Sequence, residues 1–121
     1  MTESLKILVA DDNDTDRLIL STILKKEGHE VVQAVNGREA VDLFSSSRPH
    51  LVLLDAIMPE LDGSGAAREI KNIAGEDLVP IIFLTSLTDA ESLASCLDAG
   101  GDDFLSKPYQ RVILKAKIHA F

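Results

Sequence analysis

The chain has 121 residues, 45% of them hydrophobic, and a formal net charge of −8 at pH 7. This length suits one domain, no apolar run approaches the roughly 18 residues that span a bilayer, and the negative charge disfavours direct binding to nucleic acid. The single cysteine, Cys96, lies on an apolar helical stripe and cannot form an intrachain disulfide, so we expect a packed thiol in an untargeted, cytoplasmic domain.

Strand and helix patterns alternate along the chain, beginning with an apolar run at residues 6–10. Asp11 and Asp12 end this run, and continuous apolar runs of this length are typical of strands buried on both faces of a sheet. Residues 14–27 then have the apolar period of a helix, and Gly28 is placed to cap its end. The core-facing stripe predicted for this helix contains Ile19, Leu20, Ile23 and Leu24.

The second and third strands are predicted at residues 31–35 and 51–54. Asn36 and Glu39 form a capping pair for the helix between them, which ends near residues 45–47. The third strand is the most apolar and ends at Asp55. The residues of the second helix that are predicted to face the core are Ala40, Leu43 and Phe44.

Two further strands, residues 79–84 and 104–106, complete the pattern. Thr85 ends the first of them, and Lys107 and Pro108 follow the second. The helices around these strands again show apolar stripes. The core-facing positions predicted for the last three helices are Ala66, Ala67, Ile70 and Ile73, then Ala90, Leu93, Ala94 and Leu97, and finally Leu114, Ile118 and Phe121.

Five such strand–helix units predict an α/β protein with a doubly wound parallel sheet and right-handed crossovers. In sheets of this kind, ligands bind beyond the carboxyl ends of the strands. The side chains that follow the predicted strands are therefore candidates for one shared site. They are Asp11, Asp12, Asp55, Thr85 and Lys107.

Three carboxylates, a hydroxyl and an ammonium at one sheet edge suit phosphoryl transfer. Like charges at close range disfavour one another unless a cation intervenes, and Lys107 offers one positive charge against three negative ones. Mg²⁺ binds carboxylate oxygens and water, and would complete the balance. The cation and the ammonium would then neutralise the transferring group, the hydroxyl would donate to it, and a carboxylate would be the nucleophile.

The chain resembles the receiver domains of two-component response regulators in four stretches. These are residues 8–12 (LVADD), 54–59 (LDAIMP) with 62–63 (DG), 84–86 (LTS) and 107–108 (KP). Each motif is short, but together they occur in order, at the spacing of the family and over nearly the whole chain. The resemblance implies one receiver domain over residues 1–121, with a flavodoxin-like (βα)5 fold and strand order 2-1-3-4-5.

The resemblance also implies a role for each strand-end residue. Asp55 would accept the phosphoryl group. Asp11 and Asp12 would hold Mg²⁺, directly or through water, together with Asp55 and the backbone carbonyl of Ile57. Lys107 would pair with the phosphoryl group.

The family further implies a switch and a lifetime control. Thr85 would turn its hydroxyl toward the phosphoryl group, and Phe104 would then swing inward, although an aromatic residue in a buried strand is also explained by core packing alone. The bond before Pro108 would be cis. Ile57 and Leu87 stand where family members border the path of the hydrolysing water, and their apolar side chains predict slow loss of phosphate.

A receiver domain is a signalling switch that assists its own phosphorylation and dephosphorylation, and not an enzyme with turnover. The resemblance implies a histidine kinase or histidine phosphotransfer protein as the phosphodonor, and a conformational change at the last two helices and the fifth strand. The receiver acts on an output domain or a separate target protein, which the sequence does not identify. A phosphorylation-dependent dimer is a further expectation, and contact with membranes or nucleic acid is not expected.

Three other interpretations rest on parts of the same sequence. Residues 12–16 are similar to a calcium loop but lack its sixth-position glycine and twelfth-position glutamate. Asp12 and Asp14 match the start of haloacid-dehalogenase-type phosphatases, although Asp16 departs from their pattern. Residues 100–104 (GGDDF) are similar to the signature loop of diguanylate cyclases, although here they precede a Lys-Pro pair.

His29, His50 and His119 lack the spacing of a zinc site and are expected at the surface.

Overall fold

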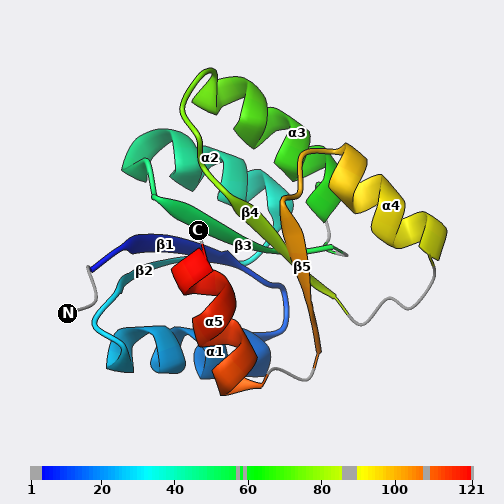
Figure 1. Cartoon of the computed structure of the whole chain (residues 1–121). Coiled ribbons are helices and arrows are strands. Elements are labelled where there is room, and N and C mark those ends of the chain that lie inside the picture. Colours follow the sequence, from blue (N-terminus) through cyan, green and yellow to red (C-terminus); the bar gives the residue numbers. More distant parts are fainter. Residues whose placement is uncertain (1–3, 57, 59, 86–89, 108–109, 121) are drawn as a thin grey trace.

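The computed structural model describes residues 4–56, 58, 60–85, 90–107 and 110–120. Strands and helices alternate along the chain as predicted, and no strand boundary moves by more than two residues (Figure 1). The strands are β1 (Lys6–Ala10), β2 (Glu30–Ala34), β3 (Leu51–Asp55), β4 (Ile81–Thr85) and β5 (Asp103–Ser106). The helices are α1 (Asp14–Lys26), α2 (Gly37–Ser47), α3 (Gly63–Ala74), α4 (Ala90–Asp98) and α5 (Arg111–Ala120).

The five strands form one parallel sheet in the order β2-β1-β3-β4-β5, which confirms the predicted order. At one end of the sheet, Ala10 pairs with Leu54, and Asp55 with Leu84. Because all pairs are parallel, the carboxyl ends of β1, β3, β4 and β5 lie at the same edge. The residues that follow these strands are therefore brought together.

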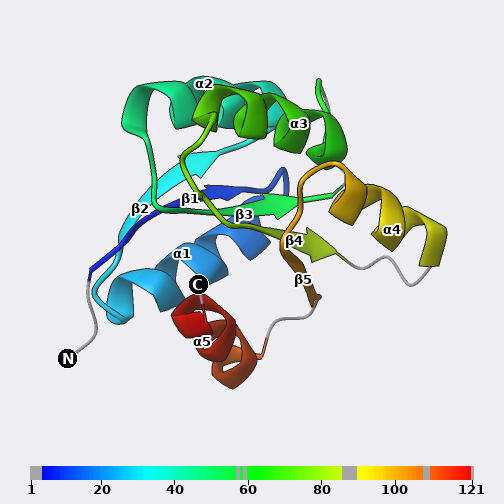
Figure 2. The same cartoon turned by 45° about the horizontal axis from the view of Figure 1, so that its top comes forward.

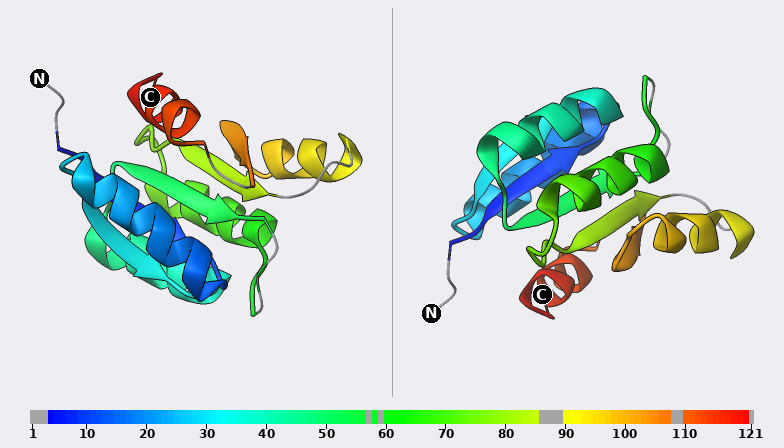
Figure 3. Two further views of the ribbon diagram at one scale, coloured as in Figure 1. Left: turned by 90° about the horizontal axis from the view of Figure 1, so that it is seen from below. Right: turned by 90° about the horizontal axis from the view of Figure 1, so that it is seen from above.

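Helices cover both faces of the sheet (Figure 2). Along β3, Val52 and Leu54 pack in the apolar cluster shared with α2 and α3. Leu51 and Leu53 point the other way and pack in the cluster shared with α1 and α5. This alternation follows from the two-residue period of a strand, and it explains why the inner strands are apolar along most of their length. Helix α4 lies beside α3, at the β4–β5 side of the sheet (Figure 3).

The core-facing stripe of α1 differs from the predicted one. Leu20 and Leu24 are buried as predicted and Ile23 is half-buried, but Ile19 is 48% exposed and Ser21 is buried in its place. Leu20, Ser21 and Leu24 lie within about one quadrant of a helix with 3.6 residues per turn, whereas Ile19 projects to the other side. The prediction failed because it included apolar residues only, and a small serine occupies part of the inward face.

The face that α4 turns inward also differs. Ala94 and Leu97 are exposed, Leu97 to 39%, whereas Cys96 and Ala99 are buried. The end of this helix is anchored by a hydrogen bond from the amide of Gly101 to the carbonyl of Cys96. The small residues Cys96 and Ala99 pack in the apolar cluster shared with α3, and part of the predicted stripe lies in solvent. The buried position of Cys96 agrees with the packed thiol expected from the sequence.

The capping pair predicted for α2 is confirmed. The Asn36 side chain accepts the amide of Glu39 at 2.7 Å, and the Glu39 carboxylate accepts the amide of Val35 at 3.2 Å. At the other end of the chain, Leu114 and Ile118 of α5 are buried as predicted, and Phe121 lies outside the described residues. Within the described part of the chain, no helix has the length and apolar character needed to cross a membrane.

Candidate functional site

The site lies at the carboxyl edge of the sheet, where the ends of β1, β3 and β4 meet. Asp11 and Asp12 follow β1, Asp55 is the last residue of β3, and Thr85 is the last residue of β4. Lys107 follows β5 and reaches back across β4 to Asp55. The structure thus brings to one edge of the sheet all five residues that the sequence predicted to share a site.

The ammonium of Lys107 is surrounded by carboxylates from three elements. Its Nζ lies 2.9 Å from Oδ2 of Asp55, 3.2 Å from Oδ2 of Asp11 and 3.4 Å from Oδ2 of Asp16. The Lys107 side chain is 19% exposed, whereas Asp11 is fully buried. Lys107 and Asp11 are shielded from water, so their charges attract each other more strongly than those of a surface ion pair do.

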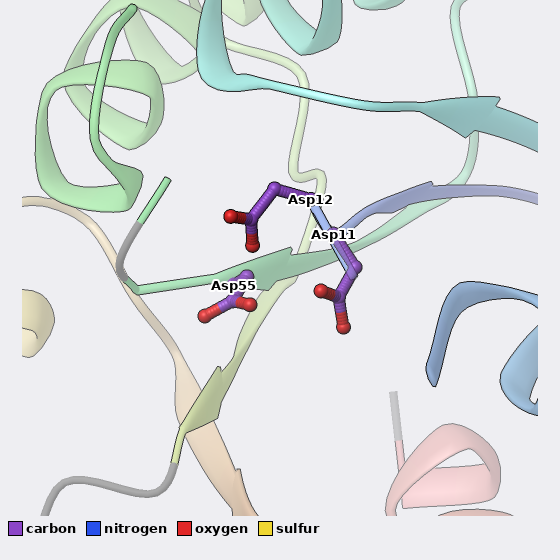
Figure 4. A group of neighbouring side chains, drawn as sticks. All are labelled: Asp11, Asp12 and Asp55. Atoms are coloured by element: carbon purple, nitrogen blue, oxygen red, sulfur yellow. The ribbon is translucent and has the colours of Figure 1, made fainter. Parts of the chain in front are cut away.

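The carboxylates of Asp11, Asp12 and Asp55 face one another (Figure 4). Asp11, Asp12 and Asp55 each offer an oxygen, and these atoms lie within 4.8 Å of one another. Asp11 and Asp55 are buried and Asp12 is exposed, so the cluster opens to solvent on the Asp12 side. Oxygen donors gathered this closely fit a hard divalent cation such as Mg²⁺, which favours carboxylates and retains some water.

The Asp11 carboxylate is held by the turn that begins α1. Oδ1 of Asp11 accepts the amide of Asn13 at 2.9 Å, and the amide of Asp11 donates to Ala34 of β2 at 3.2 Å. A guanidinium nitrogen of Arg17 donates to the carbonyl of Asp11 at 2.7 Å. These contacts fix the end of β1 relative to α1, and with it the position of the Asp11 side chain.

The position of Asp55 is fixed by a tight connection between β3 and α3. The amide of Gly63 donates to the carbonyl of Ala56 at 3.0 Å, and the amide of Ala56 donates to Leu84 of β4 at 3.1 Å. A Cβ atom on Gly63 would lie 2.3 Å from the carbonyl oxygen of Asp55. Glycine is therefore required at position 63 because the backbone passes this close to Asp55.

Thr85 and Lys107 are joined through the backbone. The amide of Lys107 donates to the carbonyl of Thr85 at 2.9 Å, and Thr85 is 2% exposed. Phe104, which pairs with Phe83 in the β4–β5 register, is half-buried and packs against the apolar cluster on the α2–α3 face. The candidate switch residues thus lie on neighbouring strands that end at the site.

Three of the predicted site positions are not described by the structure, whereas one residue that the sequence did not identify contacts the site. Ile57, Leu87 and Pro108 lie outside the described residues. Asp16 was not predicted to contact Lys107, because it lies in the first turn of α1 and does not follow a strand. No sequence feature marks Asp16 as a contact of Lys107, because the two residues lie far apart in the chain.

The residues behind the alternative interpretations take other roles. Asp14 is 88% exposed and pairs with Arg17, away from Asp12. Asp102 accepts the amide of Ile81 at 2.8 Å and the ammonium of Lys71 at 3.0 Å, so it joins α3 and β4 to the start of β5. These contacts give both acids structural partners and do not support the phosphatase or cyclase interpretations.

The sequence matches the response regulator receiver domain family over residues 7–119. Over 115 residues it is 42% identical to the probable transcriptional regulator ycf27 of Porphyridium aerugineum, and 42% identical to the response regulator MprA of Mycolicibacterium vanbaalenii. These alignments cover 95% of this chain but 47% and 49% of the two relatives. The chain therefore spans about half the length of the curated relatives it matches.

Solved structures of receiver domains share the fold. The receiver domain of sensor histidine kinase PA1611 from Pseudomonas aeruginosa matches with a TM-score of 0.89 and 31% identity, covering 98% of this chain and 97% of that one. Its structure has a magnesium ion coordinated in the active-site cleft. The chemotaxis protein CheY4 of Vibrio cholerae matches with a TM-score of 0.90 and 26% identity, covering 98% of each chain. The sheet order, the residues at its carboxyl edge and these matches show that the chain belongs to the response regulator receiver domain family of two-component signalling.

Proposed function

We propose that this receiver domain stores a signal as an aspartyl phosphate on Asp55, formed in a Mg²⁺-dependent reaction. The observation that carries the proposal is the environment of Asp55. Asp55 is 7% exposed, and its carboxylate faces the carboxylates of Asp11 and Asp12 and lies 2.9 Å from the ammonium of Lys107. A nucleophile, oxygen ligands for a cation and a fixed positive charge therefore meet at one point.

The cation would be held by Asp11, Asp12 and Asp55, with the backbone carbonyl of Ile57 as a further ligand. When bound, Mg²⁺ neutralises negative charge on the transferring phosphoryl group. The three carboxylates position this charge beside Asp55, and the exposed side of Asp12 leaves room for water ligands and for the phosphodonor.

Asp55 supplies the nucleophile. One oxygen of its carboxylate forms a bond to the phosphorus of a phosphohistidine, or of a small acyl phosphate, while the bond between that phosphorus and the donor breaks. The donor leaves with the bonding electrons. Lys107 then pairs with the oxygens of the transferred group, where negative charge has accumulated.

The readout begins at Thr85. Its hydroxyl donates to a phosphoryl oxygen, and Phe104 on the neighbouring strand turns inward as Thr85 moves. The new contacts favour a second conformation of β5, α4 and α5, so phosphorylation acts as a population shift. The burial of Thr85 and the backbone hydrogen bond between Thr85 and Lys107 support this coupling.

The partners follow from the family and from the relatives. A histidine kinase or a histidine phosphotransfer protein in the cytoplasm supplies the phosphoryl group. Because the curated relatives are about twice as long as the match, the domain controls either an output domain that follows in the same protein or a separate target. Phosphorylation promotes a dimer or target complex through the α4–β5–α5 side.

The experiment measures labelling from acetyl phosphate by intact mass. Wild type with Mg²⁺ should gain one phosphoryl group, whereas Asp55→Asn and wild type with a chelator should gain none. Asp77→Asn is the matched control, because Asp77 is exposed and lies before β4, at the opposite edge of the sheet. Equal labelling of Asp55→Asn and Asp77→Asn would contradict the assignment.

A further variant tests the metal ligands. Asp12→Ala should bind Mg²⁺ more weakly by titration, because one carboxylate ligand is lost. Its fold should be retained, since removing a charge from the cluster relieves repulsion in the metal-free protein. Unchanged Mg²⁺ affinity in Asp12→Ala would exclude Asp12 as a ligand.

A further inference from the structure

Asp16 is an acid that contacts the phosphoryl-transfer site from a helix. Its Oδ2 lies 3.4 Å from Nζ of Lys107, and its side chain is 36% exposed. The group of acids that could hold a metal ion, Asp11, Asp12 and Asp55, does not include Asp16. Among the described residues, Asp16 is thus a carboxylate that touches the ammonium of Lys107 without belonging to the candidate metal site.

The position of Asp16 is fixed by the N-terminus of α1. Asn13 caps this helix and its Oδ1 accepts the amide of Asp16 at 2.9 Å, while the amide of Asn13 donates to Asp11 at 2.9 Å. A continuous series of hydrogen bonds therefore links the buried carboxylate of Asp11 to the backbone of Asp16. The Asp16 carboxylate is held next to Lys107 and is not at the end of a mobile loop.

Phosphorylation changes what the ammonium of Lys107 contacts. Before it, the carboxylates of Asp55, Asp11 and Asp16 all lie within 3.4 Å of Nζ. Afterwards, under the proposed function, Asp55 carries the phosphoryl group and Asp11 binds the cation. Asp16 alone of the three keeps an unchanged carboxylate.

From this geometry we infer that Asp16 is a positioning residue that competes with the phosphoryl group for the ammonium of Lys107. The inference rests on the proposed phosphorylation of Asp55. Asp16 attracts the ammonium toward α1 in both states, whereas the phosphorylated state needs it at the phosphoryl oxygens. Asp16 therefore weakens the phosphorylated state and makes it easier to reverse.

The size of the effect follows from exposure. Because the Asp16 carboxylate is partly in water, its attraction for Lys107 is that of an ion pair at or near the surface. Removing its charge is expected to strengthen binding of a phosphoryl mimic about two- to fivefold. Asp16→Glu should remain near wild type, because it keeps the charge and can still reach Lys107.

The test measures Mg²⁺-dependent binding of beryllofluoride, a stable mimic of the phosphoryl group, by ¹⁹F NMR. Asp16→Asn should bind it more tightly than wild type. Asp14→Asn is the matched control, because Asp14 lies in the same first turn of α1 but pairs with Arg17. It removes the same charge and the same interaction with the helix dipole without altering a contact to Lys107.

A second comparison asks whether Asp16 acts through Lys107. In a Lys107→Met background, the gain from Asp16→Asn should disappear. An equal gain in that background, or equal affinities of Asp16→Asn and Asp14→Asn, would overturn the inference. Failure of the proposed function looks different: wild type would not bind beryllofluoride with Mg²⁺, or Asp55→Asn would bind it as well as wild type.

Discussion

His29 lies buried before β2, and its Nδ1 accepts the amide of Leu5 at 3.1 Å. Burial lowers the pKa of His29 below its ordinary value of 6.5, and His119 lowers it further, whereas Glu27 acts in the opposite direction. The folded state therefore resists protonation. Below pH 6.5 the unfolded chain binds the proton more readily, so the free energy of unfolding falls as the pH drops through 6.5 toward the lower pKa of the folded state.

A variant without this histidine should lose that part of the acid sensitivity. We expect the difference in free energy of unfolding between wild type and His29→Gln to shrink between pH 7.5 and 5.5, measured by urea denaturation. His50→Gln is the control, because Nδ1 of the exposed His50 accepts the amide of Lys6 at 2.9 Å. It measures how much the free energy of unfolding falls when a histidine acceptor for a backbone amide is lost without burial. A difference between wild type and His29→Gln that does not change with pH would refute the assignment.

At the scale of elements, the connection between β3 and α3 packs against the start of α2. A Cβ atom on Gly37, the first residue of α2, would lie 1.8 Å from the carbonyl oxygen of Leu61. A Cβ atom on Gly65 of α3 would meet Leu61 as well, but at the end of its side chain, 2.6 Å from Cδ1. The first contact is with backbone and the second with a group that can rotate away.

These two glycines make a matched pair. Gly37→Ala should lower the free energy of unfolding by about 1–3 kcal/mol, because the backbone around Leu61 must shift to relieve the overlap. Gly65→Ala should change stability little, since a small movement of Leu61 is offset by the better helix propensity of alanine, about 0.5–1 kcal/mol. Urea denaturation of both variants measures this, and equal losses would show that the backbone contact is not the cause.

At the scale of the whole molecule, Lys107 links the site to β5 and to the helices beside it. Its ammonium contacts Asp55, and its amide binds the carbonyl of Thr85. Lys107→Ala should retain some phosphorylation, because the nucleophile and the metal ligands remain. It should transmit the signal poorly, with smaller phosphorylation-dependent chemical-shift changes in α4, β5 and α5 than wild type shows.

The control for this prediction is Lys115→Ala. Lys115 lies on α5, and its Nζ pairs with Oε1 of Glu27 at the end of α1, 3.4 Å away. The substitution therefore removes a charge from the same region without altering the site. It should show the full chemical-shift response. If Lys107→Ala responds as fully as Lys115→Ala, the coupling role of Lys107 is wrong.

The number and kind of elements, and the residues that follow the strands, could be predicted from the amino-acid pattern alone. These features are local, because a continuous apolar run predicts a buried strand. Asp11, Asp55 and Thr85 end such runs, and this is visible in the sequence without knowledge of the fold. Parallel crossovers then place the strand ends at one edge, so the composition of the site could be predicted without knowing a single distance.

Which helix faces are covered, and which charged side chains meet, depends on how the elements pack in three dimensions. The apolar period of α1 does not reveal that Ser21 turns inward and Ile19 outward, because that depends on the angle at which the helix packs on the sheet. The burial of His29, which we expected at the surface, depends in the same way on its neighbours. Asp16 meets Lys107 across 91 positions of sequence because α1 and the end of β5 converge at the site, and no local pattern records that distance.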